Sequence, residues 1–253
     1  MLKTTAAHKV LKTDPIMARL IEKAVHYEPD ARLEQSPFEV LARAIAHQQL
    51  HATAANNILK RFVALFDETP FPLPRDVIGA DQARLRAVGF SYAKIAALKD
   101  LAAKALTGVV PGRQGLDSLS DEQIIERLTQ VRGVGRWTVE MLLMFHLQRP
   151  DILPVDDFGI RNGFRLAYGL KGMPTPKALA EFGERWRPYR SIAAWYLWRA
   201  NDLAKQNLLF KPRNPPRLAL QKPPAARKNK LARKAAKPRA KAKRAPATRR
   251  RRA

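Results

Sequence analysis

Apolar residues recur at helical spacing along most of the first 210 residues, whereas strand-like alternation is scarce. Two helix starts are marked by strong capping patterns. The sequence SPFE at 36–39 combines a capping hydroxyl, a first-turn proline and a glutamate three residues after the cap, and SDEQ at 120–123 is a second capping box. The periodicity predicts helices over 36–47, 52–66, 81–88, 91–106, 120–131, 136–147, 158–168, 176–186 and 191–203. We therefore expect an all-α fold.

Charge and cysteine content narrow the class of protein. The chain has 47 Lys and Arg against 22 Asp and Glu, a net charge of +25, which favours a polyanionic partner such as nucleic acid. The absence of Cys excludes disulfides, thiolate zinc sites, Cys-ligated iron–sulfur clusters and a cysteine nucleophile. No apolar run approaches the ~20 residues of a membrane helix, and the first residues lack a secretory signal. We expect a cytoplasmic, nucleoid-associated protein with no membrane partner.

The positive charge is concentrated at the C-terminal end. Residues 211–253 hold 18 Lys and Arg, seven prolines, no acidic residue and no aromatic residue. Such a segment cannot bury enough apolar surface to offset the entropy of ordering, so we predict a disordered basic tail after a globular domain of residues 1–210. Like-charge blocks are typical of arms that hold nucleic acid. A solvated appendage without a partner is the alternative.

The connection VRGVG at 131–135 lies between two predicted helices. Two glycines two residues apart let the backbone turn sharply and approach a ligand, and the following helix begins with unpaired N–H groups. This arrangement favours phosphate binding. A helix hairpin that uses glycine only for its own geometry is the alternative.

The context of this turn resembles a known family. The run LTQVRGVGRWTVEMLLMFHLQRPDILPVDDFGIRNGF resembles the helix-hairpin-helix and Gly/Pro-rich loop with catalytic aspartate of a DNA glycosylase superfamily. Together with AIAHQQLHATAA and ERWRPYRSIAAWYLW, it resembles the alkylated-base branch, 3-methyladenine DNA glycosylase II, over roughly residues 36–202. The resemblance implies a monomer that hydrolyses the N-glycosidic bond of alkylated purines, 3-methyladenine and also 7-methylguanine, in double-stranded DNA during base excision repair.

The same resemblance implies a helical body of two lobes. One lobe would centre on residues 48–51 and the helices of 81–106, and the other on the hairpin and Asp157, with damage recognition between them. About 35 residues precede Ser36, too few for the N-terminal β domain of larger bacterial relatives.

Asp157, the second Asp of LPVDD and 20 residues after Trp137, matches the family's catalytic carboxylate. Cleavage of an N-glycosidic bond builds positive charge on the deoxyribose, which a nearby anion stabilises. A carboxylate can also position or deprotonate the attacking water. The alternative, that an Asp only caps the helix beginning at Phe158, is the favoured interpretation for Asp156.

Trp137 stands where strand-nicking relatives carry a lysine that forms a Schiff base with the sugar. Tryptophan cannot form one, so the resemblance implies a monofunctional enzyme without AP-lyase activity. It also implies that the iron–sulfur cluster of relatives of endonuclease III is missing, since this chain has no Cys to ligate it.

The base pocket and the DNA contacts are also assigned by resemblance. Trp137 and Trp198 match pocket positions where aromatic faces would stabilise a cationic base, and Phe38 is a further candidate. Other aromatic residues of the last helices and His146 are expected to be core residues. The segment at 48–51 matches the wedge that fills the gap left by a flipped base. Its members are Gln48, Gln49 in the register of the intercalating residue, and His51 near the minor groove.

In some relatives the wedge residue is leucine, and a buried polar helix junction is the alternative for this segment. The hairpin residues expected to contact DNA are Arg132, Gly133, Val134, Gly135 and Arg136, although both arginines would also be compatible with solvated surface positions. The resemblance implies no required cofactor, but a structural Na+ or K+ on the backbone carbonyls of Thr129, Val131 and Val134. The alternative function is a non-catalytic DNA-binding or nucleoid-architecture protein that uses the hairpin and the basic tail.

Overall fold

The computed structural model describes residues 4–25, 27, 34–66, 70–212 and 214–221. The chain through Gln221 forms one compact unit. Within the described ranges it is helical without named strands, and its one isolated β-bridge joins Pro174 to Leu220. None of the described helices is long and apolar enough to cross a membrane. The prediction of an all-α fold is confirmed.

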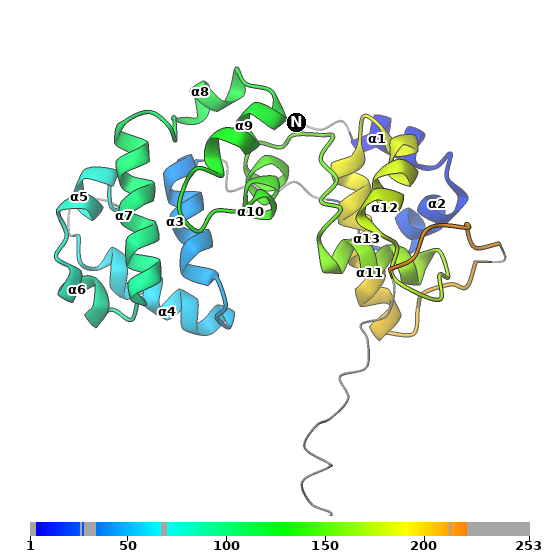
Figure 1. Cartoon of the computed structure of the whole chain (residues 1–253). Coiled ribbons are helices and arrows are strands. Elements are labelled where there is room, and N and C mark those ends of the chain that lie inside the picture. Colours follow the sequence, from blue (N-terminus) through cyan, green and yellow to red (C-terminus); the bar gives the residue numbers. More distant parts are fainter. Residues whose placement is uncertain (1–3, 26, 28–33, 67–69, 213, 222–253) are drawn as a thin grey trace, which may run out of the picture. The chain divides into compact units, whose positions relative to one another are not determined.

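The helices follow one another along the chain with short connections (Figure 1). Their bounds are α1 Thr4–Leu11, α2 Pro15–Lys23, α3 Pro37–His47, α4 Ala52–Val63, α5 Pro74–Gly79, α6 Gln82–Ala87, α7 Tyr92–Leu106, α8 Arg113–Asp117, α9 Asp121–Leu128, α10 Arg136–Met141, the π-helix η1 Leu142–His146, α11 Phe158–Ala167, α12 Pro176–Gly183, the 3₁₀-helix η2 Glu184–Trp186 and α13 Arg190–Lys205.

The helices that hold the site pack in two groups. In the first, α3 packs against α4, α7 and η1, while α7 also packs against α5 and α6. In the second, the long α13 packs against α2, α11 and η2. Figure 1 shows both groups, with α3 to α7 in blue to green and α11 to α13 in light green to orange-yellow.

Local sequence signals account for most of these helix starts. The Ser36 hydroxyl accepts the backbone N–H of Glu39, and the Ser91 hydroxyl accepts that of Lys94. Ser120 forms a full capping box with Gln123, as its sequence predicts. Each cap satisfies a backbone donor that the first helical turn leaves unpaired.

Two predicted helices change their winding part of the way along. The helix predicted over 136–147 is α-helical only to Met141, after which the N–H of Leu147 donates to the carbonyl of Leu142 in a π-helical bond of 2.9 Å. The helix predicted over 176–186 likewise ends in the 3₁₀ turn η2. Apolar spacing cannot reveal either change, because one turn that is wider (π) or tighter (3₁₀) than an α-turn leaves the sequence pattern almost unchanged.

The N-terminal helices α1 and α2, which the sequence pattern did not predict, are tied to the second group through Asp14. This buried carboxylate caps α2 by accepting the N–H of Ile16 at 2.9 Å. Its Oδ2 accepts the hydroxyl of Tyr168 at 2.6 Å and the indole N–H of Trp186 at 3.3 Å. Because the bonds join residues more than 150 positions apart, the N-terminal segment is an integral part of the domain.

Residues 211–221 correct the predicted domain boundary. The carbonyl of Ala219 accepts the N–H of Thr175 at 2.9 Å, and the N–H of Gln221 donates to the carbonyl of Met173 at 2.7 Å. Pro212 packs against Gly169, where a Cβ would lie 2.8 Å from its ring. The disorder predicted for 211–253 is therefore wrong for the described part of 211–221, because backbone pairing there compensates for the scarcity of apolar residues. The rest of the predicted tail, 222–253, lies outside the described residues.

Candidate active site

Asp157 lies at the N-terminus of α11, where it serves as the N-cap and binds two tryptophans. Its Oδ1 accepts the backbone N–H of Ile160 at 2.7 Å and the indole N–H of Trp198 at 2.9 Å. Its Oδ2 accepts the indole N–H of Trp137 at 2.7 Å. An ionised carboxylate has about four acceptor positions. Among the described residues three are filled, which leaves one position on Oδ2 for an incoming group.

The capping interpretation needs a correction. Asp157 is the cap of α11, whereas the neighbouring Asp156 is exposed and does not cap the helix. The two roles of Asp157 are compatible, because the cap uses only Oδ1.

Two glycines allow α11 and α13 to approach closely enough to bring Trp198 to the carboxylate. A Cβ on Gly159 would lie 2.8 Å from Cδ1 of Trp198, and one on Gly163 would lie 1.8 Å from the carbonyl oxygen of Leu197. Since real Cβ atoms do not come this close to other atoms, any side chain at Gly163 would force the helices apart. The indole-to-carboxylate geometry therefore depends on small residues in α11.

A pocket of about 960 Å³ lies beside this carboxylate. Trp137, which is 51% exposed, lines the pocket and also donates to Asp157. Phe145 lines it as well and stacks on Trp198, with ring centroids 5.8 Å apart and planes at 24°. The remaining lining comes from Gln35 before α3 and from α3, the wedge segment, α4, α10 and η1, and consists of Gln35, Val40, Leu41, Arg43, Ala44, His47, Gln48, Gln49, Asn56, Thr138, Met141, Leu142 and His146.

The structure changes the assignment of two predicted pocket residues. Phe38 is 6% exposed, packs edge-on against Phe71 in the core and is not among the lining residues, so its placement in the pocket is wrong. It is the second residue of α3, and its side chain lies on the core side of that helix. Trp198 is set back from the pocket behind Phe145 and contacts the carboxylate instead.

Several lining residues were not identified from the sequence. Phe145 and His146 lie in the π-helix η1, where the winding shifts their direction relative to an α-helix. His146 is buried, as expected of a core residue, but it also lines the pocket. The aromatic and polar character of the segment was visible, whereas its winding was not.

In the wedge segment Gln49, Leu50 and His51 are exposed and Gln48 is half-buried, which argues against a buried polar junction. Gln49 adopts a positive φ of 57°, a conformation that non-glycine residues seldom take and that is often found at functional sites. Leu50, which follows it in the predicted wedge segment but was given no role of its own there, is 41% exposed. His51 caps α4 by accepting the N–H of Thr53 at 3.4 Å.

Gln48 joins the wedge to the hairpin. Its amide Nε2 donates to the carbonyl of Gly133 at 2.8 Å, across 85 residues of sequence. Gly133 takes a positive φ of 77°, and a Cβ there would lie 3.5 Å from Cβ of Ala97 on α7. The prediction that the hairpin shares a lobe with Asp157 is therefore wrong in its packing, because the hairpin contacts the helices that carry the wedge.

Helix α7 makes hydrogen bonds both to the end of α3, before the wedge, and to the hairpin. The ammonium of Lys94 donates to the carbonyl of Ala46 near the end of α3 at 2.7 Å, and burial lowers the pKa of that ammonium. One turn and a half later, Oδ2 of Asp100 accepts the N–H of Arg132 at 2.7 Å. Burial alone would raise the pKa of Asp100, but the hydrogen bonds from Arg132 and Lys104 outweigh it and lower the pKa.

Arg136, predicted as a phosphate contact, is engaged by carboxylates. Its Nη atoms bind both oxygens of Glu122 at 2.8 and 3.0 Å, and its Nε donates to Glu140 at 3.1 Å. The guanidinium lowers the pKa of Glu122, whereas burial raises the pKa of Glu140 despite the same neighbour. Arg136 therefore joins α9 to α10, and its predicted phosphate contact would have to compete with these two carboxylates. Arg132 and Arg136 are both exposed, so both predicted phosphate contacts lie on the surface.

The carbonyls assigned to a cation lie at the end of α9. Thr129 is its C-cap, and the carbonyl of Val131 accepts the N–H of Val134 at 3.0 Å while retaining a second lone pair. Oxygens past the last turn of a helix carry partial negative charge. In the described part of the chain no cluster of three His, Asp or Glu offers a side-chain metal site.

Comparison with known proteins gives a consistent result. The family model described as "HhH-GPD superfamily base excision DNA repair protein" matches residues 42–188. DNA-3-methyladenine glycosylase 1 of Schizosaccharomyces pombe is 42% identical over 196 residues, which cover 77% of this chain and 86% of the relative. DNA-3-methyladenine glycosylase 2 of Escherichia coli is 32% identical over 169 residues, 64% of this chain and 56% of that protein.

A solved structure agrees in fold. The 3-methyladenine DNA glycosylase of Schizosaccharomyces pombe in complex with abasic DNA superposes with a TM-score of 0.71 at 42% identity. The match covers 79% of this chain and 98% of that one.

Proposed function

Because the chain belongs to the HhH-GPD superfamily of base excision DNA repair proteins, we propose that it excises alkylated purines from double-stranded DNA by hydrolysing their N-glycosidic bonds. The substrates are 3-methyladenine and, by the same chemistry, 7-methylguanine and related cationic lesions. The relatives named as 3-methyladenine glycosylases support this substrate class. Likeness to the Escherichia coli glycosylase 2 supports assignment to type II.

The observation that carries the proposal is the carboxylate of Asp157 beside an aromatic pocket. Trp137 contacts both, since its indole N–H donates to Oδ2 of Asp157 and its ring lines the 960 Å³ cavity. Such a cavity has room for a purine that has left the base stack. An alkylated purine is cationic, and the faces of Trp137 and Phe145 suit stacking on a cation.

The reaction then needs little acid catalysis from the protein. As the bond from C1′ to the purine nitrogen breaks, its electron pair neutralises the positive charge of the alkylated base. Positive charge grows on the sugar instead, and the carboxylate of Asp157 stabilises it. A water oxygen bonds to C1′, and its proton passes to Asp157 or to solvent, which leaves an abasic site and a free base.

The donors around Asp157 hold the carboxylate ready for this step. Trp198 and the N–H of Ile160 fix Oδ1, and Trp137 fixes one side of Oδ2. Because the remaining acceptor position is on Oδ2, we expect that oxygen to take part in the reaction. Such preorganisation avoids the rearrangement of dipoles that water would need at each turnover.

We also propose that the enzyme is monofunctional. A lyase step needs an amine to form a Schiff base with the sugar, and the residue beside Asp157 in the corresponding position is Trp137. Borohydride should therefore fail to trap a covalent complex with DNA that contains the abasic site left by base release. Trapping of the wild-type protein would contradict this part of the proposal.

The wedge and the hairpin supply the DNA contacts in this scheme. Gln49, Leu50 and His51 are exposed at the end of α3 and would fill the space of the flipped base. The backbone N–H groups of the hairpin, with Arg132, would bind the phosphates of the damaged strand. The bond from Gln48 to Gly133 holds these two elements in register.

We propose that the carbonyls of Thr129, Val131 and Val134 hold a monovalent cation such as Na+ or K+. They fit such an ion, because carbonyl oxygens are hard donors and these three lie close together in sequence at the end of α9. A bound cation would neutralise part of the phosphate charge at the hairpin. No other cofactor is proposed.

The decisive experiment is incubation with methylated DNA, with free 3-methyladenine and 7-methylguanine measured by chromatography. Wild-type protein should release both, and the abasic strand should break only after alkali or heat. Asp157→Asn should lose release but keep binding, since Asn caps helices as well as Asp does. Wild-type protein that binds DNA yet frees no base from alkylated, deaminated or etheno-modified DNA would favour an architectural role.

A further inference from the structure

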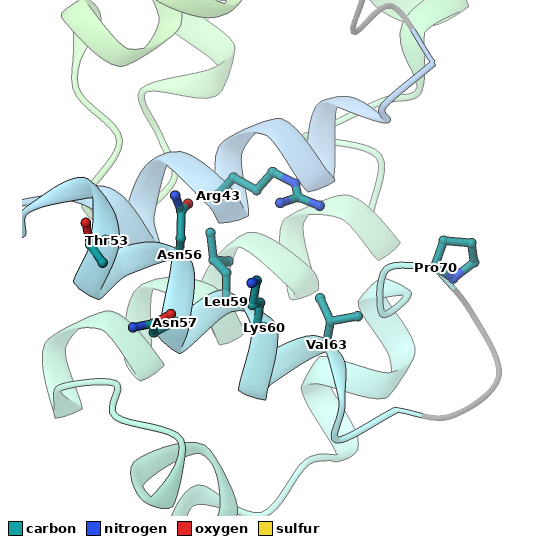
Figure 2. A pocket seen from close by; sticks show the side chains of 8 residues that line it. All are labelled: Arg43, Thr53, Asn56, Asn57, Leu59, Lys60, Val63 and Pro70. Carbon is teal, nitrogen blue, oxygen red and sulfur yellow. The ribbon is translucent and has the colours of Figure 1, made fainter.

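A polar groove on α4 is not used by the chemistry described above. It has a volume of about 600 Å³ and lies beside the base pocket, with which it shares Arg43 and Asn56. Figure 2 shows Arg43 on α3, a row of side chains from Thr53 to Val63 on α4, and Pro70 beyond the end of the helix. The groove is therefore continuous with the proposed site but extends away from it along α4.

Hydrogen-bond donors line one face of this helix. Thr53, Asn56, Asn57 and Lys60 are spaced by three, four and seven residues, so they share one side of α4. All four are exposed, and among the described residues their side chains have neither hydrogen-bond partner nor ion pair. None of the eight residues that line the groove is Asp or Glu.

The net charge of the groove is positive because of Lys60. The other cation, Arg43, is balanced by Glu39, whose Oε1 lies 2.8 Å from its guanidinium. Among the described residues the ammonium of Lys60 has no carboxylate partner, and amide and hydroxyl donors lie beside it in the groove. This combination is typical of protein contacts to phosphate and sugar oxygens.

The residue types on this face lower the intrinsic stability of the helix. Asn and Thr form helices less well than Ala, and solvent-facing helix positions without a function tend to hold strong helix formers. Local choices that work against the fold are expected mainly at functional sites. The row Thr53, Asn56 and Asn57 therefore indicates a binding surface.

We propose that this α4 groove binds the backbone of the undamaged DNA strand opposite the lesion. The inference rests on the proposed function. The wedge residues lead directly into α4, because His51 is its N-cap, whereas Gln48 on the other side of Gln49 is bound to the hairpin. If the hairpin holds the damaged strand and Gln49 enters the duplex between the strands, the undamaged strand continues past the wedge along α4.

The length of the surface fits this partner. Seven residues separate Thr53 from Lys60, which corresponds to about 10 Å of helix. DNA rises about 3.4 Å per base pair, so the row spans about three pairs. A short backbone segment just beyond the wedge would satisfy all four donors.

The test uses the full chain with Asn57→Ala and Lys60→Ala combined, because both changes introduce better helix formers and neither residue lines the base pocket. The probe is a duplex with one synthetic abasic-site analogue, compared with the same strand alone. We expect about tenfold weaker binding of the duplex and a salt dependence of log K reduced by about 1, with single-strand affinity unchanged. Lys177→Ala on α12, where the side chain is 87% exposed, is the matched control and should leave both quantities unchanged.

A second arm locates the contact. Neutral methylphosphonates, placed one at a time along the undamaged strand, should remove the difference between variant and wild type at one or two positions only. Methylphosphonates in the damaged strand should not remove it. Equal losses on duplex and single strand, an unchanged salt dependence, or an effect confined to damaged-strand phosphates would overturn the proposal.

Base release by the wild type separates this proposal from the one above. If the wild type releases no base from methylated DNA, the proposed function fails whatever the groove binds. If release is normal but the double variant binds the duplex as the wild type does, only the groove assignment fails. Binding of an acidic peptide in place of duplex DNA would likewise reject it.

Discussion

The indole nitrogen of Trp137 lies 2.7 Å from Oδ2 of Asp157, the carboxylate oxygen that keeps one acceptor position open. The same ring lines the pocket, so one side chain contacts both the reacting group and the space for the base. Removal of this donor therefore tests the chemistry without emptying the pocket.

For Trp137→Phe we expect base release to slow by about 10- to 100-fold, the kinetic equivalent of a hydrogen bond to a charged group worth about 1.5–3 kcal/mol. The aromatic face remains, so affinity for an abasic-site duplex should change little. Single-turnover release and fluorescence anisotropy measure the two quantities. Unchanged release would mean that Oδ2 does not depend on the indole.

Gln48→Met should separate the wedge from the hairpin while keeping the size of the side chain. Loss of the 2.8 Å bond to Gly133 should weaken binding to a lesion duplex by about two- to tenfold and leave binding to undamaged duplex unchanged. Competition binding with the two duplexes measures the ratio. Gln206→Met on an exposed position is the control, and an equal loss on both duplexes would contradict a wedge-specific role.

Gly163→Ala should disturb both the fold and the site, because the added Cβ would lie 1.8 Å from the Leu197 carbonyl. Overpacking costs about 1–3 kcal/mol or more, which corresponds to a Tm lower by at least about 2–10 °C for a domain of this size. Activity should fall further, since separating α11 from α13 withdraws Trp198 from Asp157. Gly79→Ala, with nothing within 4 Å of the new Cβ, should leave Tm within a degree or two of wild type or raise it.

The bond between Tyr168 and Asp14 predicts that the stabilities of wild type and Tyr168→Phe depend differently on alkaline pH. Burial, with Asp14 beside it, raises the pKa of Tyr168 well above 10.0. Since the unfolded chain ionises near 10.0 and the folded one does not, the stability of wild type should fall by about 1.4 kcal/mol per pH unit above that value. Tyr168→Phe lacks this loss.

At pH 8 to 9 Tyr168→Phe should be less stable by about 1.5–3 kcal/mol, because the hydroxyl bond to a buried carboxylate is missing. The difference should shrink between pH 10 and 11. Urea unfolding at each pH measures it, and a constant gap across this range would refute the ionisation argument. Tyr27 and Tyr196, whose pKa values burial also raises, are common to both proteins.

Truncation at two places distinguishes the body from the basic segment. Ending the chain after Gln221 removes 15 Lys and Arg and should weaken non-specific DNA binding and its salt dependence, with unchanged base release. Ending it after Phe210 also removes the backbone bonds to Met173 and Thr175 and should lower Tm by a further 4–8 °C or so. Equal Tm values for the two truncated chains would show that 211–221 adds no stability.

Features written in local sequence were predictable. Ser36 and Ser120 cap helices where their motifs place them. These signals act over three or four residues, so they survive without knowledge of the fold. The resemblance supplied the proposed role of Asp157 and the pocket position of Trp137, but not the hydrogen bond that joins them.

Features that depend on distant partners were not predictable. The pocket position of Phe145 depends on a π-helical turn, and the role of Gln48 depends on a carbonyl 85 residues away. Phe38 was misplaced because an aromatic residue near a pocket helix does not reveal which side of that helix it occupies. The ion pair of Arg136 could not be predicted either, because its partner Glu122 lies on another helix.

Asp157 both caps α11 and carries the proposed chemistry, and this combination has a genetic consequence. Since Asn would preserve the helix cap, a cell in which this codon changes to Asn would still accumulate a folded protein that finds alkylated sites. Alkylated bases that are bound but not excised would be shielded from other repair routes. Such an allele should therefore sensitise cells to methylating agents more than a deletion does. Alanine at the same position, which abolishes the cap as well, should behave more like the deletion.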